Sequence, residues 1–347
     1  MKKNILIYPF TESCIPFIHQ LDLMAFNLIL VSPRGWGYEN RKFSIHGETF
    51  NVTTEFELNC IECDEVWFVN CSFKIDDNLL IIPKIKIAQK KDKIIKYFRT
   101  KTAEVQELLG SKENSKQEVP DGLGTIYTPI VLVAGLFRHS GGWESELALL
   151  DGKFRDEYKV VQICSEPEGE LLGMRPFPKF MTNSNYNESE KIISFNRYIE
   201  EIEKSEKPDL LIIGVPGGIK AYSRDIPEDF GMLFTMVSSA VSADFLVLSL
   251  PYAEYSKSDL DELKRSIWQK YQVYTDFIYL SRKMVMPYDS DNAHKLLYMM
   301  LEKERISKKI KEINDESLYD VEEEKERVRL QNNIINKLSE FGEIEFM

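Results

Sequence analysis

A glycine-containing loop between an apolar run and an amphipathic segment holds the residues best suited to bind a ligand. Residues 129–134 have the pattern of a buried strand, and residues 143–154 have the apolar spacing of a helix. Backbone N–H groups of such a loop favour an anion, which Arg138 can bind with two hydrogen bonds, while His139 can titrate near neutral pH. The candidate ligand-binding residues of this loop are Gly135, Arg138, His139, Ser140, Gly141 and Gly142. A plain strand-to-helix turn without a ligand is the alternative.

The loop departs from the sequence that nucleotide hydrolysis requires. A Walker A loop reads G-x-x-x-x-G-K-[ST], with its lysine on the phosphates and its hydroxyl on Mg²⁺. Counted from Gly135, the second glycine, the lysine and the hydroxyl are replaced by Ser140, Gly141 and Gly142. The acidic Glu144 follows closely and is expected to repel phosphate. The sequence therefore favours a turn or a degenerate anion or nucleotide pocket over an active nucleotidase.

Two further loops are expected near the first one. The apolar strand 209–215 ends in Gly217 and Gly218, which either join the binding site or serve close backbone packing. The tip of this strand lacks the acid that binds Mg²⁺ in P-loop proteins. The other loop, residues 166–173, carries three glutamates that can bind a metal or a basic peptide, or can simply be solvated.

The cysteines and histidines predict no metal site. Cys60, Cys63 and Cys71 offer three thiolates, but Cys63 and Cys71 lie at opposite ends of a predicted strand around Trp67. The histidines form no H-x-x-x-H or H-E-x-x-H pattern. We therefore expect free, buried thiols, and no catalytic residue can be assigned.

The elements that position these loops alternate between strand and helix, which predicts an α/β fold of two domains. Residues 1–110 are expected to form a Rossmann-like domain, residues 111–126 a polar linker, and residues 127–290 a P-loop-NTPase-like, doubly wound domain. The predicted strands are residues 4–8, 28–32, 65–69, 129–134, 158–163, 209–215 and 245–250, and the predicted helices include residues 75–88, 190–204 and 231–241.

A charged segment over residues 291–347 completes the chain. Its pattern predicts helices over residues 293–313 and 321–341, broken near Asn314, as a helical C-terminal extension. Val321, Val328 and Ile335 follow heptad spacing and form a thin apolar stripe. This stripe is expected either to pack on the chain's own body or to form a homodimer contact.

The overall composition limits the partners. The chain has 347 residues and a formal net charge of −12, which disfavours binding to nucleic acid or to an anionic membrane surface. Five cysteines, an odd number, argue against a secreted disulfide framework. Neither a signal peptide nor a membrane-spanning run is apparent, so we expect a cytoplasmic protein.

Several segments resemble the clostridial peptide-maturation-system proteins. The resemblance covers about residues 4–285. It is carried by residues 4–10 (NILIYPF), 31–37 (VSPRGWG), 63–69 (CDEVWFV), 158–163, 170–173 (ELLG), 177–181 (FPKFM) and 208–218. Members of this family are encoded beside radical-SAM peptide maturases and short precursor peptides. They tend to carry a lysine where Gly142 stands here, so phosphate binding is not carried over.

The resemblance implies an accessory role in the maturation of a ribosomally synthesised, post-translationally modified peptide. The expected partners are the precursor peptide, a radical-SAM maturase, or both. An ATP- or GTP-dependent ligase or NTPase that uses residues 135–145 is the alternative, with Glu166 or Glu168 on Mg²⁺. A dinucleotide binder built on the first domain ranks lowest, because residues 9–13 contain no G-x-G-x-x-G.

Overall fold

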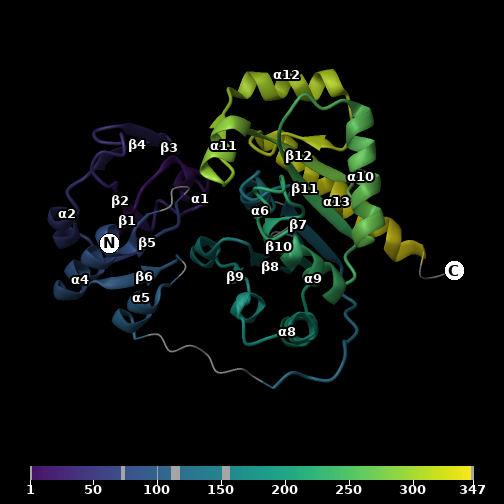
Figure 1. The fold of residues 1–347 in the computed structure, drawn as a ribbon, viewed down its shortest axis with the longest axis horizontal. Helices are drawn as coiled ribbons and strands as arrows, with labels where there is room; N and C mark the ends of the chain where they lie inside the picture. The colour runs from purple at the N-terminus through teal and green to yellow at the C-terminus, as the bar shows by residue number, and fades with distance from the viewer. Residues whose placement is uncertain (1, 72–74, 100, 111–117, 151–156, 345–347) are drawn as a thin grey trace. The chain divides into compact units, whose positions relative to one another are not determined.

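The computed structural model describes residues 2–71, 75–99, 101–110, 118–150 and 157–344. The chain forms two compact units (Figure 1). The first unit contains Met1–Ser115 and Pro167–Gly173, and the second contains Lys116–Glu166 and Met174–Met347. Both units are α/β, as the alternation of strand and helix patterns predicted. The predicted linker falls partly on residues 111–117, which lie outside the described residues.

The first unit is built on a six-stranded sheet in the order β3-β4-β2-β1-β5-β6. Its five parallel strands, taken in chain order, lie in the order 3-2-1-4-5, which is the Rossmann arrangement. An antiparallel β3–β4 pair at one edge was not predicted. The strands are β1 (Lys3–Tyr8), β2 (Phe26–Val31), β3 (Lys42–Ile45), β4 (Glu48–Thr53), β5 (Glu65–Phe68) and β6 (Ile94–Tyr97).

Short helices cover this sheet. The predicted single helix over residues 75–88 is wrong, because Pro83 begins a new helix at α4 after a one-turn α3. Proline has no N–H to donate and is therefore tolerated only in the first turn. The helices are η1 (Glu12–Cys14), α1 (Ile15–Ile18), α2 (Phe56–Glu62), α3 (Asp77–Leu80), α4 (Ile82–Lys90) and α5 (Ala103–Leu108).

The second unit contains an eight-stranded sheet in the order β13-β12-β11-β7-β10-β8-β9, with β14 beside β12. Taken in chain order, the parallel strands from β12 to β8 lie in the order 5-4-1-3-2, so the sheet is doubly wound and P-loop-like, as predicted. These strands are β7 (Ile130–Gly135), β8 (Val160–Cys164), β9 (Arg175–Pro176), β10 (Leu210–Gly218), β11 (Phe245–Tyr252), β12 (Phe277–Val285), β13 (Tyr298–Met300) and β14 (Leu318–Tyr319).

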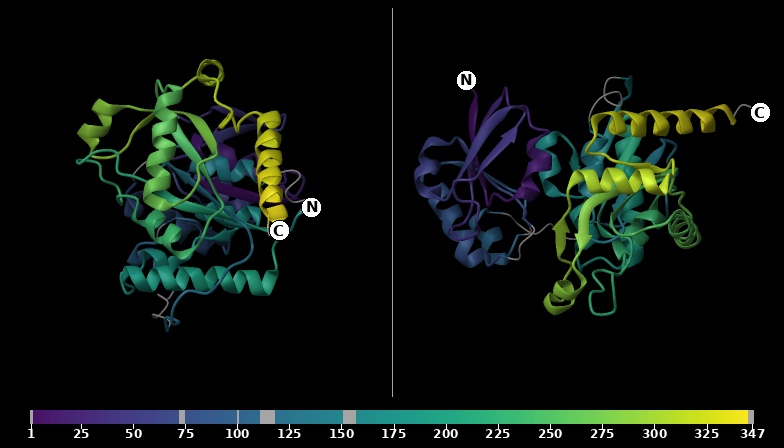
Figure 2. Two further views of the ribbon diagram at one scale, coloured as in Figure 1. Left: turned by 90° about the vertical axis from the view of Figure 1, so that its right-hand side faces the viewer. Right: turned by 90° about the horizontal axis from the view of Figure 1, so that it is seen from above.

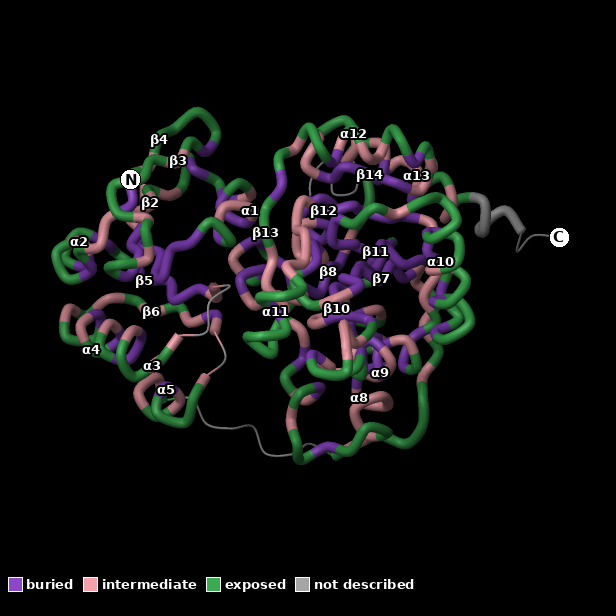
Figure 3. The backbone as a smooth tube through the Cα atoms, turned by 45° about the horizontal axis from the view of Figure 1, so that its top comes forward, coloured by how far each residue is buried: buried purple, intermediate pink, exposed green. Residues whose placement is uncertain are grey.

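Helices cover both faces of this sheet (Figure 2). One apolar core packs α8, α9, α10 and α12 against one face, and a second core packs α6 and α13 against the other. The central strands are buried along most of their length (Figure 3). The helices are α6 (Gly142–Ala148), η2 (Pro167–Leu172, part of the first unit), η3 (Lys179–Thr182), α8 (Glu188–Glu206), α9 (Met232–Ala240), α10 (Lys257–Tyr271), α11 (Pro287–Ala293), α12 (Lys303–Ile313) and α13 (Glu324–Ile344).

The segment after residue 290 differs from the predicted extension. It contains β13 and β14, which pair with β12 and belong to the second sheet. The helical break at Asn314 is confirmed, since this residue has a φ of 50°. Ile306, Leu330 and Ile334 pack into the cores of the second unit. Of the predicted stripe, Val321 is buried in the second core and Ile335 packs against it, as in the first of the two alternatives, whereas Val328 is 42% exposed.

Candidate functional site

The loop between β7 and α6 is closed by one of its own side chains. The hydroxyl of Ser140 is buried, accepts a hydrogen bond from the Phe137 N–H at 3.2 Å, and lies 2.7 Å from the Phe137 carbonyl oxygen. A Cβ atom at Gly135 would lie 2.6 Å from the Ser140 Oγ, so glycine is required there. The Ser140 hydroxyl thus holds the turn at Phe137 and also donates to the Ser249 carbonyl oxygen of β11. The predicted helix over residues 143–154 is observed to Ala148, and residues 151–156 lie outside the described part of the chain.

The second glycine loop lies beside the first. Strands β7 and β10 are parallel neighbours, and Gly218 is in register with Gly135. A Cβ atom at Gly218 would lie 2.7 Å from the Phe137 Cα, and Gly217 has a φ of 85°. The predicted residues are thus brought together, and both glycines have the steric reason that the sequence left open.

Arg138 and His139 project from the loop at its exposed side. Surrounding protein atoms, followed by the charges of Arg138 and Lys283, shift the pKa of His139 down to about 4. This direction opposes titration near neutral pH, but the side chain is exposed, so the expected titration stays a prediction. The sequence did not reveal the charge of Lys283, because this residue comes from β12, far along the chain.

The same lysine supplies a partner for Glu144. Lys283 Nζ lies 2.5 Å from Glu144 Oε1, and both side chains are largely shielded from solvent. Strand β12 passes close to the loop: a Cβ atom at Gly141 would lie 2.9 Å from the Ser281 Cβ and from the Tyr279 ring. Ser281 and Lys283 are two residues apart on β12, so their side chains lie on the same face of the strand. Sequence reasoning placed Glu144 as an unpaired repulsive charge and missed this ion pair.

The most unusual group of the second unit is the carboxyl group of Glu146. It is fully buried, and its Oε2 atom accepts a hydrogen bond of 2.8 Å from the backbone N–H of Ser165, just after β8. Its Oε1 atom has no hydrogen-bond partner among the described residues. Burial raises the pKa of Glu146 to about 8, and the nearby carboxylates of Glu166 and Glu144 add to this shift.

The Glu146 carboxyl group lies against Gly214, in the middle of β10 and beside the end of β8. A Cβ atom at Gly214 would overlap this carboxyl group, so the glycine leaves the room that the group fills. An acid from α6 thus reaches β10 four residues before its tip, and the sequence did not predict it. The signal in the sequence was Gly214, a single glycine inside the apolar run of residues 210–215.

The glutamates of residues 166–170 do not act as one cluster. Glu166 belongs to the second unit, near Glu146. Glu168 belongs to the first unit, where it is buried and accepts a hydrogen bond from the backbone N–H of Asn70, just after β5. Glu170 is exposed. The interpretation of Glu168 as an exposed, solvated group is therefore wrong.

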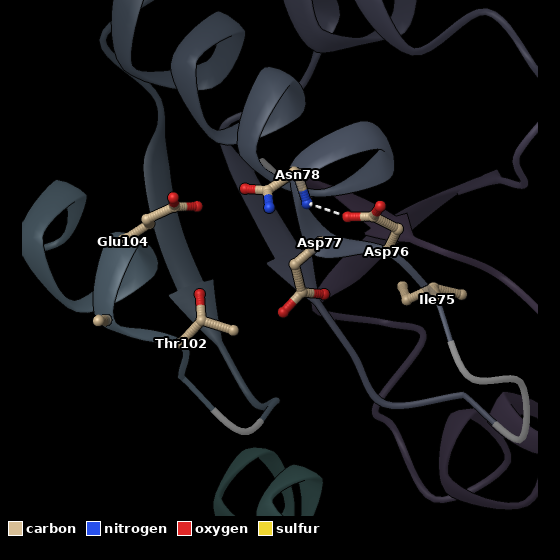
Figure 4. Close-up of a pocket in the computed structure, with 7 residues that line it drawn as sticks. Ile75, Asp76, Asp77, Asn78, Thr102 and Glu104 are labelled. Atoms are coloured by element: carbon tan, nitrogen blue, oxygen red, sulfur yellow. Dashed lines mark hydrogen bonds between the residues drawn. The ribbon is translucent and has the colours of Figure 1, made fainter.

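The first unit has a pocket of its own at the carboxyl end of its sheet, with a volume of about 420 Å³ (Figure 4). It was not predicted. The side chains of α3 and of the start of α5 line it, among them Asp77, Thr102 and Glu104. Asp77 pairs with the largely buried Arg99 at 3.3 Å, and Arg99 also donates to the Val69 carbonyl oxygen. The pocket is thus acidic and contains no phosphate-binding glycine loop.

No disulfide links the five cysteines; four of them are buried and Cys71 is partly exposed. Within the described ranges, no group of three or more histidine, cysteine, aspartate or glutamate side chains lies together as a metal site. The described helices include none with the length and apolarity needed to cross a membrane.

Comparison with known proteins identifies the fold. No family model matches the chain, and no curated protein matches it. The chain resembles a solved DUF1611 family protein from Anabaena variabilis, with a TM-score of 0.58, 12% identity, and coverage of 92% of this chain and 96% of that one. This similarity defines a protein of two α/β units.

Two weaker structural similarities each cover part of this chain. A complex of Cyanothece McdA with ATP has a TM-score of 0.30 and 12% identity, covering 56% of this chain and 82% of that one. Aspartate semialdehyde dehydrogenase II from Vibrio cholerae has a TM-score of 0.25 and 10% identity, covering 62% of this chain and 69% of that one. Neither similarity carries an argument about function.

Proposed function

We propose that the protein is an accessory factor in the maturation of a ribosomally synthesised peptide, and that its second unit binds the precursor peptide in an extended conformation. The observation that carries the proposal is the edge strand β13. It pairs with β12 on one side and ends the order of strands in the described sheet. An extended peptide can add to such an edge through main-chain hydrogen bonds.

The side chains of β13 suit an apolar peptide contact. Met299 and Met300 are 42% and 54% exposed, and methionine adapts its shape to varied partners. The hydroxyl of Tyr298 donates a hydrogen bond of 2.6 Å to the Arg138 carbonyl oxygen, which ties β13 to the β7–α6 loop. A peptide on β13 would therefore lie beside the exposed Arg138 and His139, and the net charge of −12 favours a basic peptide.

The experiment is a binding titration with labelled precursor peptides from the same gene cluster. The variant Met299→Lys/Met300→Lys adds like charge to β13 and is expected to weaken binding of a basic peptide by about tenfold or more. The matched control is Met24→Lys in the first unit, where the methionine is 81% exposed, and its affinity should equal that of the wild type. Absence of binding to any precursor peptide or maturase would contradict the proposal.

One observation favours the alternative, an ATP- or GTP-dependent enzyme. Glu146 places a carboxyl group against Gly214 of β10, the strand whose end carries the metal-binding acid in P-loop enzymes. The closed loop and its missing lysine count against this alternative. Calorimetry with ATP and GTP, with and without Mg²⁺, separates the two, since only the enzyme would give saturable heats at millimolar nucleotide.

A further inference from the structure

The carboxyl group of Glu146 has two features that an ordinary buried acid lacks. Its Oε1 atom is buried without a hydrogen-bond partner among the described residues, although buried polar atoms are nearly always paired. The residue beside this carboxyl group is Gly214, which has no side chain, and the carboxyl group occupies the space that a Cβ atom there would need. A structural hydrogen bond to Ser165 explains one oxygen atom of this group and leaves the other unexplained.

A second carboxylate lies close by. Glu166 follows Ser165 directly at the end of β8, and its charge raises the pKa of Glu146. Ser165 and Glu166 are both partly exposed, so solvent reaches the residues next to the buried carboxyl group. Strands β8 and β10 are parallel neighbours, and β8 ends at Cys164, beside Gly214 of the longer β10. Ligands of open α/β sheets bind at such strand ends.

We propose that Glu146 and Glu166 hold a hard divalent cation, such as Mg²⁺ or Mn²⁺, at the carboxyl end of β8, beside Gly214 of β10. A cation there would bind the unpaired Oε1 atom and would offset the repulsion between the two carboxylates. Mg²⁺ commonly takes one or two carboxylates and completes its shell with water.

The cation site does not require a nucleotide. The loop that binds phosphate in P-loop proteins does not fit this chain, because Ser140, Gly141 and Gly142 replace its glycine, lysine and hydroxyl residues. The acid part fits, with the carboxylate supplied by α6 instead of by β10. The site also does not depend on peptide binding at β13, so Met299→Lys/Met300→Lys should leave cation binding unchanged.

The test is a titration of the full chain with Mn²⁺ alone, followed by calorimetry and by electron paramagnetic resonance of the free ion. The wild type is expected to bind one Mn²⁺, and Mg²⁺ should compete. Glu146→Gln keeps the size of the side chain and should weaken binding by about tenfold or more. The matched control is Glu201→Gln on an exposed position of α8, which should bind as the wild type does.

A swap of the acid makes the test more specific. The double variant Glu146→Ala/Gly214→Asp moves the carboxylate from α6 to β10, and its Mn²⁺ binding should be stronger than that of Glu146→Ala. If the Glu146 variants do not fold, as judged by circular dichroism, then Glu166→Gln decides, and it should also weaken Mn²⁺ binding. No saturable Mn²⁺ binding by the wild type, or equal binding by Glu146→Gln or by a folded Glu166→Gln, would overturn the proposal.

Discussion

The carboxyl group of Glu146 fills the space that a side chain at Gly214 would need. An acid on α6 thereby reaches the middle of β10, a strand that itself contains no acid. The two residues are 68 positions apart in the sequence, and only the parallel pairing of β10 with β7 brings them together.

This contact predicts how the pair responds to substitution. Gly214→Ala places a methyl group against the Glu146 carboxyl and should lower the free energy of unfolding by about 1–3 kcal/mol. In the double variant Gly214→Ala/Glu146→Ala the clash is removed, so the two effects should not add. Urea denaturation of the two single variants and the double variant measures the coupling. Strict additivity would show that the two side chains do not compete for space.

The buried acid predicts a pH dependence of stability. The folded-state pKa of Glu146 is raised to about 8 from an ordinary value of 4.5, so the folded state holds a proton that the unfolded chain has lost between these pH values. Stability should therefore fall as the pH rises from about 4.5 to 8, by up to about 1.4 kcal/mol per pH unit. Glu146→Gln removes this group, and its melting temperature should fall less over that range. Parallel pH profiles of the two proteins would refute the assignment.

The ion pair between Lys283 and Glu144 predicts an asymmetric double-mutant cycle. Lys283→Met leaves the shielded Glu144 carboxylate unpaired and should cost about 1–3 kcal/mol of stability. Lys283→Met/Glu144→Gln removes both charges and should recover most of that loss. The free energies of unfolding of these variants provide the check. A double variant less stable than Lys283→Met would contradict a direct interaction.

The packing of α13 predicts a large effect of its buried residues. Ile334 is fully buried in the second core of the second unit, and Ile334→Ala should cost about 2–5 kcal/mol. The control is Val328→Ala, because Val328 is 42% exposed and should change stability by less than about 0.5 kcal/mol. If instead α13 served only as a homodimer contact, Ile334→Ala would shift the oligomeric state in sedimentation and leave the stability of the monomer unchanged.

The strands of both sheets that the sequence predicted are those with continuous apolar runs. Residues 129–134 and 209–215 are recognisable because a parallel strand is buried on both faces. Strands β3 and β13 were missed, since both lie at a sheet edge and carry mixed residues. Helix α8 was recognisable from its long apolar periodicity, and its Asn187–Glu190 capping box fixes its start.

The candidate site shows a different limit. The sequence correctly paired the two glycine loops, because neighbouring strands of a doubly wound sheet end at one edge. The charges at the loop could not be predicted. Lys283 contacts Glu144 from β12, a strand that was not predicted, and Glu146 contacts β10 from helix α6. Side-chain contacts of this kind depend on the packing distance between elements, which no local pattern contains.

The most direct test of the proposed function is the affinity of the full chain for its precursor peptide, measured by fluorescence anisotropy with the wild type, Met299→Lys/Met300→Lys and Met24→Lys. We predict that the wild type binds the precursor peptide saturably. The affinity should fall by about tenfold or more in Met299→Lys/Met300→Lys and should stay unchanged in Met24→Lys. Equal affinity of all three proteins, or no binding by the wild type, would contradict it.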